Sequence, residues 1–300
     1  MSGFFRGHKR RGSYDLFSSY NHFLPGYGSI VALVALFIAG ALIGDILGDW
    51  FLKGMSLIMD EAPAAGYKFL IAYPVSFVPA MLFASTMSRL NEHRTDAVPL
   101  DRKLKDWSRP GLIITASIFA TIAAAYIVEP STYLLPEMPA DLKTQLEAIL
   151  NGLPFWATLL SVSVFAPVFE EWLCRGLILR GLLKKTPPAV AILLSALVFA
   201  LIHGNIWQGI SAFCLGALFG YVYYRTGSLK LTMIMHCANN TLAAILSLIP
   251  QFKDAETFMD VLSPWAYWSI YALCILIVLS SIVLLRSAQP RQDCQACQHQ

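Results

Sequence analysis

Charged residues are scarce in this sequence. Asp, Glu, Lys and Arg make up 14% of its 300 residues, and hydrophobic residues make up 56%. Since a soluble domain carries about 25% charged residues, the deficit excludes an ordinary soluble domain. It indicates a protein that crosses a membrane several times. The formal net charge of +3 is too small to suggest a nucleic acid as a partner.

The N-terminus carries no cleavage signature. The first 24 residues are polar and basic, and the apolar run after them is longer than the core of a signal peptide. We therefore expect no cleaved secretion signal, and we expect the first span to direct insertion. No internal repeat is apparent, which favours a single membrane domain.

A set of cysteines with the spacing of a structural metal site is also missing. Four of the six cysteines lie in apolar runs, where free thiols behave as small hydrophobes. Cys294 and Cys297 form one CxxC in a polar tail, short of the four ligands of a closed zinc site. Because Gln298 and His299 are not aliphatic, the tail is no C-a-a-X prenylation signal either.

Eight segments are long enough to cross the ~30 Å hydrocarbon core as helices. They are 28–48, 67–88, 111–128, 154–184, 188–203, 207–224, 229–249 and 265–285. The fold class we expect is all-α, a polytopic bundle of about eight transmembrane helices. The fourth segment exceeds the length that a bilayer needs, so its C-terminal turns should protrude.

The distribution of Lys and Arg predicts the orientation of these spans. With a cytoplasmic N-terminus, 17 of the 22 Lys and Arg fall in the inner segments, and 3 in the outer ones. Cytoplasmic loops carry such an excess. Both termini are therefore expected in the cytoplasm. The outer loop 129–153 holds leucines and isoleucines at helical spacing, which predicts an amphipathic helix on the outer membrane surface.

This parse divides the chain into five parts. They are a cytoplasmic N-terminal segment (1–27), three spans with their loops (28–153), a core that we expect to be catalytic (154–250), a last span (251–285) and a cytoplasmic tail (286–300).

Ionisable residues at membrane depth cost roughly 2.5–3.5 kcal/mol each on insertion scales, so each is a functional hypothesis. Asp45 and Asp49 lie at the C-terminal end of the first span, and the sequence does not assign them a role. The others gather in later segments: Glu170, Glu171 and Arg175 in "FEEWLCR", His203 in "FALIHG" and His236 in "MHCANN".

Helix geometry separates the two glutamates. Glu171 and Arg175 are four residues apart on one face, in the favourable order for an ion pair. Glu170 lies about 100° around the helix, so it has no internal partner. An unpaired carboxylate at this depth should have a raised pKa, which suits a general base. A purely structural ion pair is the alternative for Glu171 and Arg175.

Spacing places His203 near Glu170. The two residues lie about equally far from the turn "KKTPP", roughly 25 Å along the arms of one hairpin. His236 fits this depth less well, although it shares a face with Asn240 and has Asn239 close by. An Asn amide beside a His can donate to a developing oxyanion. Hydrogen bonding between helices is the alternative for these residues.

In order, these motifs resemble those of the CPBP (Abi) family of CaaX-type prenyl proteases and bacteriocin-processing enzymes. "EEWLCR" matches E-E-x-x-x-R, "FALIH" matches F-x-x-x-H and "HCANN" matches H-x-x-x-N. The resemblance covers about 155–250. The first three spans, the last span and the tail gain no support from it.

The resemblance implies an all-helical intramembrane endopeptidase. Glu170 would activate a water, with Glu171 and Arg175 supporting the site. His203 and His236 would bind or polarise the water and the carbonyl. Asn240 would stabilise the oxyanion.

Two mechanisms stay open. Glu170, His203 and His236 could hold Zn²⁺ with one open position, although H-E-x-x-H is absent. Alternatively, glutamate acts as the base without a metal. No nucleophile is evident, since Cys237 and His236 are adjacent and point apart on a helix.

The expected substrate is a membrane-embedded or lipidated peptide or protein within the lipid bilayer. The location would be the plasma (inner) membrane in a bacterial cell. Two other functions remain, a non-catalytic scaffold or immunity protein and a proton-coupled carrier that uses the same Glu and His residues. Against the carrier, the sequence shows no repeated halves of the kind that many transporters have.

Overall fold

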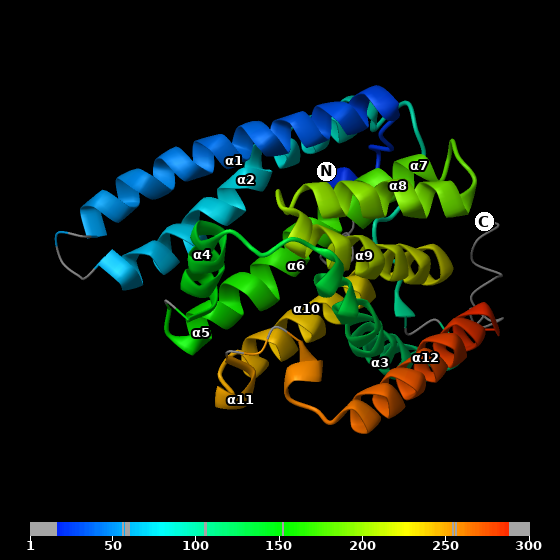
Figure 1. Cartoon of the computed structure of the whole chain (residues 1–300). Coiled ribbons are helices and arrows are strands. Elements are labelled where there is room, and N and C mark those ends of the chain that lie inside the picture. Colours follow the sequence, from blue (N-terminus) through cyan, green and yellow to red (C-terminus); the bar gives the residue numbers. More distant parts are fainter. Residues whose placement is uncertain are drawn as a thin grey trace, which may run out of the picture.

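The computed structural model describes residues 17–55, 57, 61–104, 107–151, 153–253, 255 and 257–287. The tail with Cys294 and Cys297 and most of the N-terminal segment lie outside these residues. Within them the chain is a bundle of helices joined by loops (Figure 1). This confirms the expected all-α class.

The long helices follow the predicted spans closely. They are α1 (Tyr27–Met55), α2 (Glu61–Asn91), α3 (Pro110–Val128), α8 (Pro188–Leu201), α9 (Ile206–Thr226), α10 (Leu229–Leu246) and α12 (Pro264–Ser287).

One further span is built from five consecutive elements that run as a continuous helix. They are α5 (Phe155–Thr158), η4 (Leu159–Phe165), α6 (Ala166–Glu171), η5 (Trp172–Leu179) and α7 (Arg180–Leu182). We call the whole of it the central helix, 155–182. The stretches η4 and η5 are π-helical. Such wide turns are rare and often occur at functional sites.

The remaining elements are short. They are η1 (Ser18–Tyr20), η3 (Glu129–Leu134), α4 (Ala140–Asn151), α11 (Pro250–Lys253) and η6 (Phe258–Asp260). The amphipathic helix expected in loop 129–153 is therefore present as α4.

Six of the eight predicted segments are long and apolar enough to cross a membrane. The other two, α8 and α10, depart from the expectation for different reasons. With 14 residues, α8 is too short for the criterion. Polar residues such as His236 and Asn240 lower the hydropathy of α10. Six candidate spans are enough to make the chain an integral, multi-pass membrane protein.

Local sequence explains the turns around the core. Two consecutive prolines mark the start of α8: Pro187 precedes the helix, and Pro188 is its first residue, where a missing N–H costs nothing. The side chain of Asn205 caps the start of α9 by accepting from the Gln208 N–H. Gly227 ends α9 with a positive φ of 65°, which glycine adopts without strain. Ser228 then caps α10.

Loops predicted on the same side of the membrane contact one another. On the side predicted to be inner, the Arg180 guanidinium donates to the Val98 carbonyl, and the Arg102 N–H donates to the Gly227 carbonyl. On the other side, the Trp207 indole donates to the Pro136 carbonyl. This agrees with the two-sided parse, whereas which side faces the cytoplasm stays a prediction.

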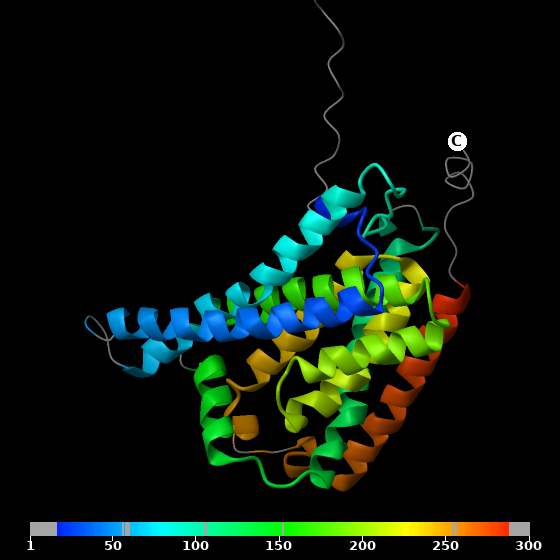
Figure 2. The same ribbon diagram turned by 90° about the horizontal axis from the view of Figure 1, so that it is seen from above.

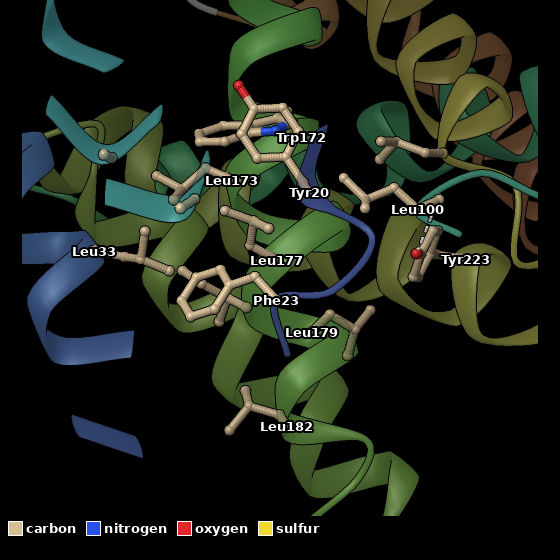
Figure 3. Close-up of a cluster of buried hydrophobic side chains, with 14 of the residues drawn as sticks. Tyr20, Phe23, Leu33, Leu100, Trp172, Leu173, Leu177, Leu179, Leu182 and Tyr223 are labelled. Atoms are coloured by element: carbon tan, nitrogen blue, oxygen red, sulfur yellow. Dashed lines mark hydrogen bonds between the residues drawn. The ribbon is translucent and has the colours of Figure 1, made fainter. Parts of the chain in front are cut away.

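The largest buried cluster joins the N-terminal segment to the central helix (Figure 3). Tyr20 lies edge-on to Trp172, with ring centroids 5.1 Å apart. Phe23, Leu33 and Leu177 fill the space beside them. The central helix is thereby enclosed by protein over much of its surface, and 61% of its most apolar window is buried.

The helices α1 and α2 pack side by side, and the far end of the pair projects beyond the other helices (Figure 2). Small residues of α1 allow this close approach. A Cβ at Gly44 would lie 2.5 Å from the Ala72 carbonyl oxygen, too close for any side chain. Small residues four apart are typical of helix pairs in membranes.

Candidate functional site

Four of the six residues singled out by sequence converge on one hollow inside the bundle. Glu170, His203, His236 and Asn240 line a cavity of about 350 Å³, which we call the central cavity. They come from the central helix, the turn after α8, and α10. The match in depth between Glu170 and His203 is therefore confirmed, and His236 also reaches the cavity despite its poorer spacing.

Glu171 and Arg175 lie behind the cavity and form the expected ion pair. Their side chains are fully buried, with Arg175 Nη1 2.8 Å from Glu171 Oε1. Nη2 donates to the Gly216 carbonyl of α9 at 2.8 Å. The guanidinium also lies over the Phe199 ring, 4.4 Å from its centroid. The pair thus ties the central helix to α8 and α9.

His236 lies between the two glutamates. Its Nδ1 is 3.2 Å from Glu171 Oε1, and its Nε2 is 3.9 Å from Glu170 Oε2. An imidazole that donates from Nδ1 to a carboxylate leaves Nε2 as its acceptor. Glu171 can therefore set the tautomer of His236, with Nε2 toward Glu170.

Glu170, for which we expected no partner on its own helix, is bonded from another helix. The hydroxyl of Tyr73 on α2 donates to Glu170 Oε1. The other oxygen, Oε2, is buried and has no hydrogen-bond partner among the described residues. Only one carboxylate oxygen is thus left for a ligand. Sequence reasoning missed Tyr73, because a tyrosine in an apolar span carries no distinguishing pattern.

His203 is held by the end of its own helix. Its Nδ1 is 2.7 Å from the Phe199 carbonyl oxygen, which fixes Nδ1 as the donor. Nε2 is therefore the ring nitrogen available to a ligand.

The Asn240 amide is oriented at both ends. Its Nδ2 donates to the Val162 carbonyl in η4 at 2.7 Å, and its Oδ1 accepts from the Asn239 amide at 3.2 Å. Since an amide nitrogen carries two hydrogens, a second N–H is left for a ligand.

A second hollow of about 260 Å³ adjoins the first. Its lining includes His203, Gln208, His236 and Asn240, which also line the central cavity. The remaining wall brings Trp207, Ser211 and Asn239, among others. The two histidines and Asn240 therefore line both hollows.

The described residues do not assemble a metal site. No group of three or more His, Cys, Asp or Glu side chains among them is gathered closely enough to hold a metal ion. The set of Glu170, His203 and His236 considered for zinc thus does not fit the ion in this arrangement, and the mechanism proposed below uses none.

The cysteines near the motifs stay away from the reacting groups. Cys174 is fully buried, and Cys237 Sγ lies 3.9 Å from the Thr241 hydroxyl. Neither lines the central cavity.

Fold and site together define a polytopic helical membrane protein with ionisable groups gathered inside its bundle. Residues 152–242 match the family model described as "Type II CAAX prenyl endopeptidase Rce1-like". The resemblance to CaaX-type proteases is thereby confirmed over this segment, which contains all six predicted site residues. Tyr73 and α4 lie outside it.

One curated relative supports the same class. A Bacillus subtilis (strain 168) protein named "Putative membrane peptidase YdiL" is 28% identical over 88 residues. The alignment covers 29% of this chain and 36% of that protein, so the chain matches about a third of the relative's length. No solved structure matches the chain.

Proposed function

We propose that the protein is an intramembrane endopeptidase that hydrolyses a peptide bond of a membrane-associated peptide or protein. The observation that carries this proposal is the state of Glu170. Its Oε2 is buried without a hydrogen-bond partner among the described residues, in a cavity that His203, His236 and Asn240 also line. A buried polar atom without a partner is costly unless a ligand or water satisfies it.

In the proposed reaction Glu170 is the general base. Its Oε2 takes a proton from a water molecule, and the water oxygen attacks the carbonyl carbon of the scissile bond. The carbonyl electron pair moves to oxygen and forms an oxyanion. The proton then passes to the amide nitrogen, the C–N bond breaks, and a carboxyl terminus and an amino terminus are released.

The neighbouring groups have separate tasks. His236 Nε2, 3.9 Å from Glu170 Oε2, binds or polarises the attacking water, and His203 does so for water or carbonyl. Asn240 offers its second N–H to the oxyanion, a type of contact that contributes about 2.7–4 kcal/mol in proteases. Glu171 and Arg175 act on these groups by orienting His236.

The test compares the wild type with Glu170→Gln at matched levels in cell membranes. This substitution preserves volume and leaves Tyr73 a partner, so the protein should fold while peptide cleavage is abolished. The measurement is a survey of peptide termini in those membranes. Asp45→Asn, which removes a carboxylate outside the cavity, is the matched control and should cleave normally.

Identical termini in wild type and Glu170→Gln would contradict the proposal. They would favour a non-catalytic scaffold or immunity protein, or a proton-coupled carrier. Proton-dependent flux in liposomes would then separate the carrier from the scaffold.

A further inference from the structure

One wall of the central cavity is apolar and comes from the part of the chain outside the family match. Its members are Phe69 of α2 and three residues of α4, Leu146, Ile149 and Leu150. Glu170, His203, His236 and Asn240 line the same cavity. The cavity therefore combines this apolar wall with the reacting groups.

The sequence of α4 explains this wall. Leu146, Ile149 and Leu150 share one face of the helix, as residues three and four apart do. Lys143, Thr144 and Glu147 are exposed on the rest of its surface. Three residues of the apolar face that we expected on the membrane surface thus line the central cavity. In Figure 1, α4 lies beside α2, and the two helices are in contact.

We propose that this wall is a subsite for a bulky apolar side chain of the substrate, next to the scissile bond. The inference rests on the proposed function. A pocket with apolar walls and few polar groups binds apolar side chains and uses the polar groups to fix orientation. A substrate carbonyl held by Asn240 places a flanking side chain against Ile149 and its neighbours.

The geometry also assigns the selection of substrates to α4 and α2. The reacting groups all come from residues 152–242, whereas this wall comes from elsewhere in the chain. Relatives that share the matched segment can therefore differ in the side chains they accept.

The experiment uses full-length protein in liposomes and pairs of peptides that differ at one residue beside the bond cleaved by the wild type. One peptide carries Leu there and the other Ala, and each flank of the bond is tested. The proteins are wild type, Ile149→Trp, Ile149→Ala and Thr144→Trp. Thr144 is exposed on the opposite side of α4, so it controls for the added indole.

We expect Ile149→Trp to fill the subsite and lower cleavage of the Leu peptide about 10-fold relative to the Ala peptide. Ile149→Ala should enlarge the subsite and raise cleavage of the Leu peptide relative to the Ala peptide. Thr144→Trp should leave this ratio unchanged. A ratio that is identical in all four proteins would overturn the subsite while the proposed function stands. Cleavage of neither peptide by any protein, wild type included, would overturn both.

A separate observation concerns Tyr73. Its hydroxyl donates to Glu170 Oε1, and its ring stacks on Phe69 with centroids 4.9 Å apart. The ring also meets Phe77 edge-on at 5.5 Å, and Phe77 stacks on Phe169, the neighbour of Glu170. Aromatic contacts on both sides thus fix the position of the hydroxyl.

We infer that Tyr73 is a positioning residue for Glu170. By holding Oε1, it turns Oε2 toward His236 and the cavity, which favours the geometry that proton abstraction needs. This inference also rests on the proposed function.

The test is Tyr73→Phe, which keeps the stacked ring and removes the hydroxyl. We expect kcat to fall about 10-fold with KM unchanged, and the melting temperature to fall no further than in the matched control. Tyr267→Phe is the matched control, because that tyrosine also donates to a carboxylate, Glu129, away from the cavity. An unchanged kcat would overturn the inference. A fall in kcat that Tyr267→Phe reproduces would overturn it as well.

Discussion

The helix α1 and the central helix reverse the relation between hydropathy and burial that soluble proteins show. The best 18-residue window of α1 has a mean hydropathy of 2.6 and is 28% buried inside the protein. The corresponding window of the central helix has a mean hydropathy of 1.3 and is 61% buried. The more apolar helix is thus the more exposed one.

The membrane explains the reversal. Lipid is as apolar as leucine, so it covers α1 at no cost. The exposed large apolar side chains of α1 include Val31, Ile38, Leu42 and Ile46. The central helix, by contrast, is covered by protein, and hydrogen bonds hold Glu170 Oε1, Glu171 Oε1 and both Nη atoms of Arg175. A span can therefore keep Glu170, Glu171 and Arg175 only where other helices enclose it.

The largest expected effect follows from breaking the buried pair. Glu171→Gln leaves the Arg175 charge without its counter-ion at a fully buried position, which should destabilise the protein by about 3–5 kcal/mol. Expression and the melting temperature in detergent measure it. The double change Glu171→Gln with Arg175→Met removes the stranded charge and should recover much of the loss. Normal stability of Glu171→Gln alone would contradict this account of the pair.

A smaller effect compares the same substitution on the two helices. Leu177→Ala removes a fully buried side chain from the central helix and should cost about 2–5 kcal/mol. Leu42→Ala on α1 removes a side chain that is 65% exposed, and its cost should stay within about 0.5 kcal/mol. Melting of both variants under one condition measures the difference. Equal destabilisation would mean that a partner other than lipid covers α1.

Sequence predicted the features that depend on local helical geometry. The pairing of Glu171 with Arg175 follows from a four-residue spacing, and the shared depth of Glu170 and His203 follows from counting along one hairpin. Both predictions assume the fixed rise and twist of an α-helix, and both hold although η5, which contains Arg175, is π-helical. Most span limits agree with the structure to within a few residues, because hydropathy changes sharply where the chain leaves the membrane.

Features that depend on packing between distant segments escaped prediction. Tyr73 reaches Glu170 across 97 positions of sequence, and nothing in its neighbourhood marks it. Periodicity located α4 and its apolar face, yet it could not tell lipid from an interior cavity as the surface that face meets. The π-helical stretches beside Glu170 also left no pattern in residue spacing.

The smallest expected effect concerns the carboxylates whose role the sequence left open. Lys68 Nζ lies 2.6 Å from both Asp45 Oδ1 and Asp49 Oδ1, so these residues link α1 to α2. The side chains of Asp45 and Asp49 are 66% and 50% exposed, unlike the fully buried Glu171. Exposed ion pairs contribute about 0–1 kcal/mol because water and salt screen them.

Asp49→Asn should therefore lower stability by less than about 1 kcal/mol, and 1 M salt should reduce the difference further. Melting at low and high salt measures both. The prediction depends on this end of α1 lying at the water interface, where its carboxylates are solvated. A loss as large as that of Glu171→Gln, unaffected by salt, would instead place Asp49 within the hydrocarbon. The contrast between α1 and the central helix would then be one of partners rather than of solvent.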